Sequence, residues 1–185
     1  GTEPAPFHPA PEEIAPSEVL LAEDDEARAW YRGLTSRGCV EIRFPGAVNR
    51  ALAARGQRAP AHQAVWLRPA HPLDRDDLER RAAVIYLSDY LLLAVAATHH
   101  GATAQDPTFE FATLDHTVWF HSAAPTGGWI VHEQQSPWAG DGRALSTGTI
   151  RGEDGRILAT TSQLGVLRRA LRGDAPGATA PHEGR

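Results

Sequence analysis

Residues 76–97 read DDLERRAAVIYLSDYLLLAVAA and carry the strongest secondary-structure signal in the chain. Acidic residues at the start favour a helix N-terminus, the interior is rich in helix-forming residues, and Gly101 follows the end. The pattern predicts one helix from Asp76 to about Ala97. At about 100° per residue, its apolar side chains fall on a single stripe that should face the core. The stripe consists of Leu78, Ala82, Ile85, Leu92, Leu93 and Ala96.

Asp89 lies in the middle of this apolar stripe. A carboxylate that faces a core must be paired, hydrogen-bonded or neutralised, because leaving it bare in an apolar site is unfavourable. Two interpretations remain open: a structural Asp that accepts hydrogen bonds, or a functional carboxylate. A second polar group that converges on the same place, and that can hold a water molecule, would favour the functional interpretation.

Strands are predicted on both sides of this helix. Two precede it, and four segments rich in β-branched and aromatic residues follow it. The last two are joined by GEDG at 152–155, which predicts a hairpin. One long helix followed by antiparallel strands indicates an α+β fold with the helix packed on one face of a sheet. The predicted strands are 40–44, 63–68, 111–121, 128–133, 143–151 and 156–167.

The two ends of the chain differ in composition from its middle. Residues 1–16 are rich in Pro and Ala, which predicts a linker or tether. Ser17 is a good helix N-cap, and a short helix is expected from there to about Tyr31. Residues 170–185 are mostly Gly, Ala, Pro and charged residues, which is typical of a flexible tail. A single domain is therefore expected over residues 17–169, with an N-terminal helical extension.

Charge and hydropathy exclude several classes of partner. The 185 residues include 18 basic and 23 acidic side chains, so nothing attracts nucleic acid or anionic lipid at long range. No stretch is suited to spanning a bilayer and no targeting signal is present, so we expect no membrane partner and a cytoplasmic location. Cys39 is the single cysteine. The sequence contains no Met, so we expect a chain that was processed or cut from a longer one.

Two later residues could join Asp89 in holding a water molecule. Thr113 stands near the start of the first strand after the helix, and Gln163 stands in the last strand. A hydroxyl and an amide can each donate and accept hydrogen bonds, so Asp, Thr and Gln together could orient one water. Taken singly, each of the two is equally consistent with an ordinary strand residue.

Histidines suggest two other sites. His99, His100, His116 and His121 are candidate metal ligands, but adjacent histidines point in different directions and no carboxylate stands at a matching offset. We therefore expect no metal. Asp115 and His116 could form an acid–base pair, although neighbours on a strand face opposite ways.

Several motifs resemble one family, the acyl-CoA thioesterase II (TesB-like) enzymes. The most specific is the Asp-His-x-x-Trp-Phe-His element, and the resemblance covers about residues 9–169. The matching motifs are YLSD at 86–89, ATLDHTVWFH at 112–121, EQQSPWAG at 133–140, DGRILA at 154–159 and QLGVLR at 163–168.

This resemblance implies a hotdog fold, in which an antiparallel sheet wraps a long central helix. It also implies that the chain is the C-terminal half of a double hotdog, whose first half lies outside this sequence. A second hotdog half is then an expected partner, supplied by its own N-terminal half, a separate chain or a second copy, and a higher oligomer is expected. Residues 1–16 would correspond to the connection between the two halves.

The resemblance further implies hydrolysis of acyl-CoA to free fatty acid and CoA, with no cofactor. Matched motif by motif, the catalytic Asp falls on Asp89, the hydroxyl residue on Thr113 and the Gln on Gln163. Leu164 departs from the Glu that the family usually has there. Thr113 can reach Asp89 only if a β-bulge or strand crossing turns it inward. The alternatives are a noncatalytic acyl-CoA-binding or scaffolding half, and a hotdog enoyl-CoA hydratase that uses Asp115 and His116.

Overall fold

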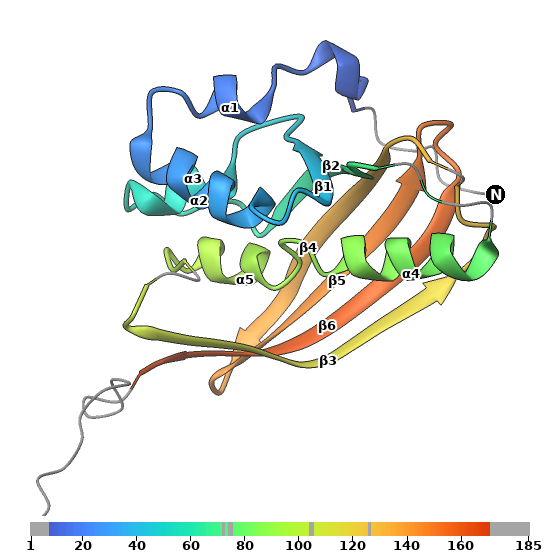
Figure 1. The fold of residues 1–185 in the computed structure, drawn as a ribbon. Helices are drawn as coiled ribbons and strands as arrows, with labels where there is room; N and C mark the ends of the chain where they lie inside the picture. The colour runs from blue at the N-terminus through green and yellow to red at the C-terminus, as the bar shows by residue number, and fades with distance from the viewer. Residues whose placement is uncertain (1–7, 72, 74–75, 104–105, 126, 171–185) are drawn as a thin grey trace, which may run out of the picture.

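The computed structural model describes residues 8–71, 73, 76–103, 106–125 and 127–170. Its strands form one antiparallel sheet in the order β1-β2-β4-β5-β6-β3, so β1 and β3 are the edge strands of the described sheet (Figure 1). The strands are β1 Val40–Arg43, β2 His62–Pro69, β3 Phe109–Phe120, β4 Ile130–Gly140, β5 Arg143–Gly152 and β6 Ile157–Arg169.

The α-helices cover one face of this sheet. α4 and α5 cross it one after the other, while α1, α2 and α3 gather at its β1–β2 end (Figure 1). The α+β prediction, with helix packed on one face of a sheet, is therefore confirmed. The helices are η1 Pro11–Glu13, α1 Ser17–Leu20, α2 Asp25–Thr35, α3 Asn49–Ala54, α4 Asp77–Ser88 and α5 Ala94–His99.

All six predicted strands are present, and β4 is longer than predicted. It continues past residue 133 to Gly140, although Pro137 has no backbone N–H to give a ladder. The pairing of β4 with β5 shifts register between Gln135 and Trp138. This irregularity accommodates Pro137 within the strand. The hairpin between β5 and β6 is confirmed.

The prediction of one helix from Asp76 to Ala97 is wrong, because the helix is broken between Ser88 and Ala94. Leu91 takes a positive φ of 65° in the break. The carbonyl groups released there are bound by side chains of the sheet: Gln134 Nε2 donates to Tyr90 O at 2.7 Å, and Gln63 Nε2 to Leu91 O at 3.4 Å. The break is therefore held by hydrogen bonds that replace those of the continuous helix.

The N-terminal region also differs from prediction. The single helix expected from Ser17 to Tyr31 is two helices, because Asp24 caps α2 by accepting from Ala27 N at 2.9 Å. α3 was not predicted. Part of the stretch interpreted as a linker packs on the sheet, where Trp66 Nε1 donates to Pro9 O at 3.1 Å. Residues 1–7 and 171–185 lie outside the described residues.

The main core lies between the helices and the sheet. It joins apolar side chains of every layer, and Val65, Leu67 and Ile150 of the sheet are fully buried in it. Burial of this apolar surface is the main favourable contribution to folding. A smaller cluster of Trp66, Trp129 and Val131 packs with Ile14 of the N-terminal segment.

Candidate active site

The structure brings the three predicted site residues together at the helix break. Gln163 Nε2, from β6, donates to Asp89 Oδ1 at 2.6 Å and to Thr113 Oγ1 at 2.9 Å. Asp89 is the C-cap of α4, and Thr113 lies in β3. A primary amide has two N–H hydrogens, so these two bonds use both. Gln163 therefore fixes the carboxylate and the hydroxyl relative to each other.

A β-bulge brings Thr113 to this site. In the pairing of β3 with β6, Thr113 stands opposite Gly165 and Asp115 opposite Leu164, so Leu114 is the extra residue. The bulge shifts the alternation of side chains by one position. Thr113 and His116, three residues apart, consequently stand opposite Gly165 and Gln163, which share one face of β6.

The predicted burial of Asp89 is wrong for the described chain. The Asp89 and Thr113 side chains are exposed, and only Gln163 is buried, with 1% of its surface exposed. The first half of the predicted apolar stripe is exposed as well: Leu78 is 73% exposed and Ile85 46%. In the second half, Leu92 and Ala96 are buried and Leu93 is half-buried. The helix break is the physical reason, because it separates the orientation of α4 from that of α5.

A buried polar layer lies beneath the helix break. Gln134 Nε2 donates to His132 Nδ1 at 2.9 Å, which leaves His132 Nε2–H to donate to Thr161 Oγ1 at 3.1 Å. Gln63 Nε2 in turn donates to Gln134 Oε1 at 2.7 Å. Complete burial, together with nearby His116, lowers the His132 pKa to about 3, so this imidazole is neutral. Gly148 makes room for it, because a Cβ there would lie 2.2 Å from His132 Nε2.

His116 contacts the residue that precedes the predicted catalytic Asp. Its Nε2 lies 2.8 Å from Ser88 Oγ, and Ser88 Oγ donates to Ile85 O at 2.7 Å. Asp115 does not pair with His116; its Oδ1 accepts from Thr117 Oγ1 at 3.1 Å. The acid–base pair of the hydratase alternative is therefore not formed.

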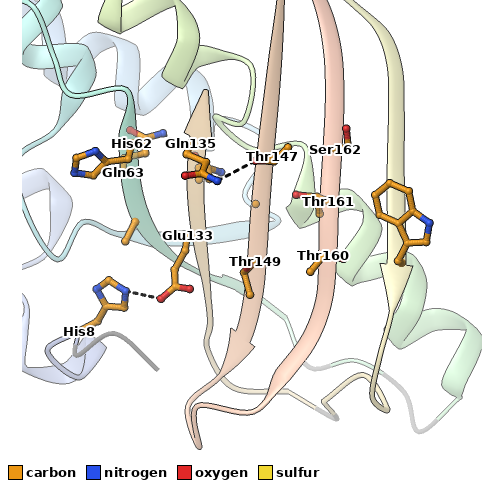
Figure 2. A pocket seen from close by; sticks show the side chains of 14 residues that line it. His8, His62, Gln63, Glu133, Gln135, Thr147, Thr149, Thr160, Thr161 and Ser162 are labelled. Carbon is orange, nitrogen blue, oxygen red and sulfur yellow. Dashed lines mark hydrogen bonds and ion pairs between the residues drawn. The ribbon is translucent and has the colours of Figure 1, made fainter. Parts of the chain in front are cut away.

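A groove on the other face of the sheet lies away from the predicted trio. It has a volume of about 700 Å³ and is lined by polar side chains of β4, β5 and β6, among them Glu133, Thr149 and Thr160 (Figure 2). His8 closes one side through its 2.9 Å contact with Glu133. None of the three predicted site residues lines this groove.

The residues with described positions form neither a metal site nor a membrane-spanning helix. No group of three or more His, Cys, Asp or Glu side chains within them is placed to hold a metal ion. No helix in that part of the chain has both the length and the apolar character needed to pass through a bilayer.

The sequence pattern missed Ser88, Ser146, His132 and Gln134, which surround the predicted trio. Ser88 stands within the YLSD motif. Ser146 alternates in β5 with the buried Ala144 and Gly148, so the alternation could have placed it on the core face.

The structure is similar to solved hotdog-fold proteins, and the predicted hotdog fold is confirmed. A protein from Alicyclobacillus acidocaldarius described as having a hot dog fold matches with a TM-score of 0.63 and 18% identity, covering 92% of this chain and 57% of its own. An acyl-CoA thioesterase II, TesB2, from Mycobacterium marinum matches with a TM-score of 0.67 and 26% identity, covering 93% of this chain and 58% of its own.

The family is shown by sequence. Residues 10–167 match the model of the acyl-CoA thioesterase C-terminal domain, and the chain belongs to that family. The human protein acyl-coenzyme A thioesterase 8 is 30% identical over 172 residues, which cover 88% of this chain and 52% of the human protein. The chain thus spans about half the length of this relative, in agreement with the prediction of a C-terminal hotdog half.

Proposed function

We propose that the protein hydrolyses acyl-CoA thioesters to free fatty acid and CoA. The observation that carries the proposal is the Gln163 amide, which donates to both Asp89 and Thr113 on the exposed side of the helix break. Family membership and the names of the relatives, acyl-CoA thioesterases, support the same activity.

In this mechanism the Asp89 carboxylate is the general base. One of its oxygens accepts from Gln163, and we assign the other to the attacking water. The Thr113 oxygen accepts from the same amide, so the Thr113 hydroxyl hydrogen is available to orient that water. The water oxygen attacks the thioester carbonyl carbon as Asp89 takes a proton. The C–S bond then breaks, and the CoA thiolate leaves and takes up the proton that Asp89 accepted, with no covalent acyl-enzyme.

The role of Gln163 in this mechanism is indirect. Both of its amide hydrogens are used by Asp89 and Thr113, so it orients the two groups that contact the attacking water and has no hydrogen left to donate to that water. Holding a base and a hydroxyl in a fixed relation is a recognised way to lower the barrier of a bimolecular attack.

A second hotdog half completes this site in our proposal. Three apolar side chains are exposed in this region: Leu78 and Ile85 on α4, the helix that Asp89 caps, and Leu114 on β3. Among the described strands, β3 pairs only with β6. Exposed apolar surface beside an unpaired strand edge is typical of an interface. The second half would cover Asp89 and Thr113 and remove them from bulk water, which is where electrostatic interactions in an active site become strong.

A thiol-release assay with acyl-CoA substrates of several chain lengths tests the activity, on this chain and on the same chain together with a second hotdog half. Asp89→Asn should lower kcat by about 10²- to 10⁴-fold, the usual contribution of a general base. Asp115→Asn is the matched control, because Asp115 is an exposed carboxylate of β3 bonded to Thr117. Near-normal release by Asp89→Asn would remove Asp89 from the mechanism. Acyl-CoA binding by the unmutated protein without thiol release would favour the noncatalytic alternative.

A further inference from the structure

Gln163 of the predicted catalytic trio belongs to a row of three polar side chains that runs across the sheet. Gln163 of β6 stands opposite Ser146 of β5 on one side and opposite His116 of β3 on the other. Residues that stand directly opposite each other on neighbouring strands bring their Cβ atoms to within about 5.5 Å, on the same face. The three side chains therefore meet on the face that carries Asp89 and Thr113.

Each member of this row has a buried polar atom that no described residue satisfies. These atoms are Ser146 Oγ, Gln163 Oε1 and His116 Nδ1. Ser146 is fully buried and Gln163 is 1% exposed. Buried polar groups in proteins are almost always hydrogen-bonded, to protein or to an ordered water molecule. Three unsatisfied atoms in one row consequently point to a shared partner.

The hydrogen positions decide what that partner can be. The single Ser88 hydroxyl hydrogen goes to Ile85 O, so Ser88 Oγ accepts from His116 Nε2–H. In the neutral imidazole this makes His116 Nδ1 an acceptor, and Gln163 Oε1 is an acceptor as well. Two acceptors cannot bond to each other. A water molecule can donate to both and accept from the Ser146 hydroxyl, which satisfies all three atoms.

We infer that His116 and Ser146 are positioning residues, which hold the Gln163 amide through a buried water molecule bound among the three side chains. This inference rests on the proposed function, because it gives these residues their effect on catalysis. With Gln163 Oε1 anchored to the water, the amide nitrogen is kept toward Asp89 and Thr113. His116 also holds Ser88, so one imidazole steadies both the amide and the residue preceding Asp89.

Kinetics of the protein with its second half separate positioning from a purely structural role. Ser146→Ala should lower kcat about threefold to tenfold, the value of one lost hydrogen bond, and leave KM for acyl-CoA unchanged. Ser162→Ala is the matched control, because Ser162 neighbours Gln163 but lines the groove on the opposite face. An equal loss in the two variants, or a change in KM alone, would overturn the inference.

Variants of His116 test its two nitrogens separately. His116→Leu should lower kcat more than Ser146→Ala does, because both contacts are lost. His116→Asn places a polar atom near the position of Nδ1 and should recover most of that loss, whereas His116→Gln, which reaches toward Ser88, should recover less. Equal recovery by Asn and Gln would contradict the assignment of Nδ1 to the water.

A double-mutant cycle tests whether Ser146 acts through Gln163. In a Gln163→Leu background, Ser146→Ala should have no further effect on kcat, because the amide it positions is absent. Additive losses would overturn the inference.

A high-resolution crystal structure gives a readout that does not depend on activity. It should show a water molecule bonded to His116 Nδ1, Gln163 Oε1 and Ser146 Oγ, and this water should be lost or displaced in Ser146→Ala. A direct bond from a protonated His116 to Gln163, without the water, would refute the inference. Failure of Asp89→Asn to reduce turnover would instead refute the proposed function, so the two outcomes are distinguishable.

Discussion

α4 and α5 follow one another along the chain, but they differ in what their apolar side chains contact. The sequence predicted them as one helix with one buried apolar stripe. α5 lies in the interior, with Val95, Ala96 and Ala97 fully buried. α4 buries Val84 and Leu87 but turns Leu78 and Ile85 to solvent. α5 thus packs on the core of its own chain, whereas α4 has a second apolar face that the described residues do not cover. Asp89 lies at the junction between the two helices.

The largest expected difference between the two helices is in how much a leucine truncation in each lowers the free energy of unfolding. Leu92→Ala, at the entrance to α5, should lower the free energy of unfolding by about 2–5 kcal/mol, because a fully buried leucine leaves a cavity. The same substitution at Leu78 of α4 should change it by less than about 0.5 kcal/mol, because that side chain is already in water. Urea unfolding followed by tryptophan fluorescence measures both, and similar losses would contradict the difference in burial.

The polar layer under the junction should make stability depend on pH. The His132 pKa is about 3 in the folded chain and about 6.5 when unfolded, so below pH 6.5 the unfolded chain binds a proton that the folded chain does not. Stability should therefore fall as the pH drops from about 6.5 toward 3, by about 1.4 kcal/mol per pH unit from this group.

Melting temperatures between pH 7 and pH 4.5 check this dependence. The His132→Asn variant should show a shallower decline than the unmutated chain, whatever its stability at neutral pH. Two parallel curves would show that His132 is not the group responsible.

Adding a methyl group to the sheet beneath the junction of α4 and α5 should lower stability. Gly165→Ala should cost about 1–3 kcal/mol, because the new Cβ would lie 2.5 Å from the Leu93 methyl groups and 3.1 Å from Ala112 O. Gly33→Ala in α2 is the control, since a Cβ there meets nothing within 4 Å. Chemical denaturation of both variants should show a loss only for Gly165→Ala; an unchanged midpoint would mean that Leu93 moves aside freely.

The smallest effect on the chain alone should come from the exposed face of α4. Ile85→Gln should change its stability by less than about 0.5 kcal/mol. Its association with a second hotdog half should nevertheless weaken by about tenfold, which corresponds to about 1.4 kcal/mol of lost apolar contact. Native mass spectrometry over a range of concentrations measures this, with Val19→Gln as an exposed apolar control on α1. Equal association of both variants would argue against this face as the interface.

Local patterns were sufficient for the strands and for the residue types of the candidate site. Alternation identified β1 and β2, and richness in β-branched and aromatic residues identified the other four strands. The motifs picked out Asp89, Thr113 and Gln163, which the structure brings within hydrogen-bonding distance through the Gln163 amide. Their catalytic role stays a prediction.

The features that sequence reasoning missed depend on residues far apart in the chain. The helix break between Ser88 and Ala94 is held by Gln134 and Gln63, whose amides bind carbonyls that a regular helix would use itself. Helical periodicity contains no information on such distant donors. The exposure of Asp89 followed from the same break, so these two missed long-range contacts account for both errors.

The extra residue in β3 has a consequence for protein engineering. Leu114 adds one residue to β3 and so shifts the alternation of side chains by one position. The Thr113 hydroxyl and the His116 imidazole, three residues apart, can therefore lie on the same face of the sheet. Removing Leu114 would restore regular pairing and an uninterrupted hydrogen-bond ladder between β3 and β6. It would also turn either Thr113 or His116 to the face of the sheet opposite the site. An irregularity that a stability designer would remove is thus the one on which the proposed chemistry depends.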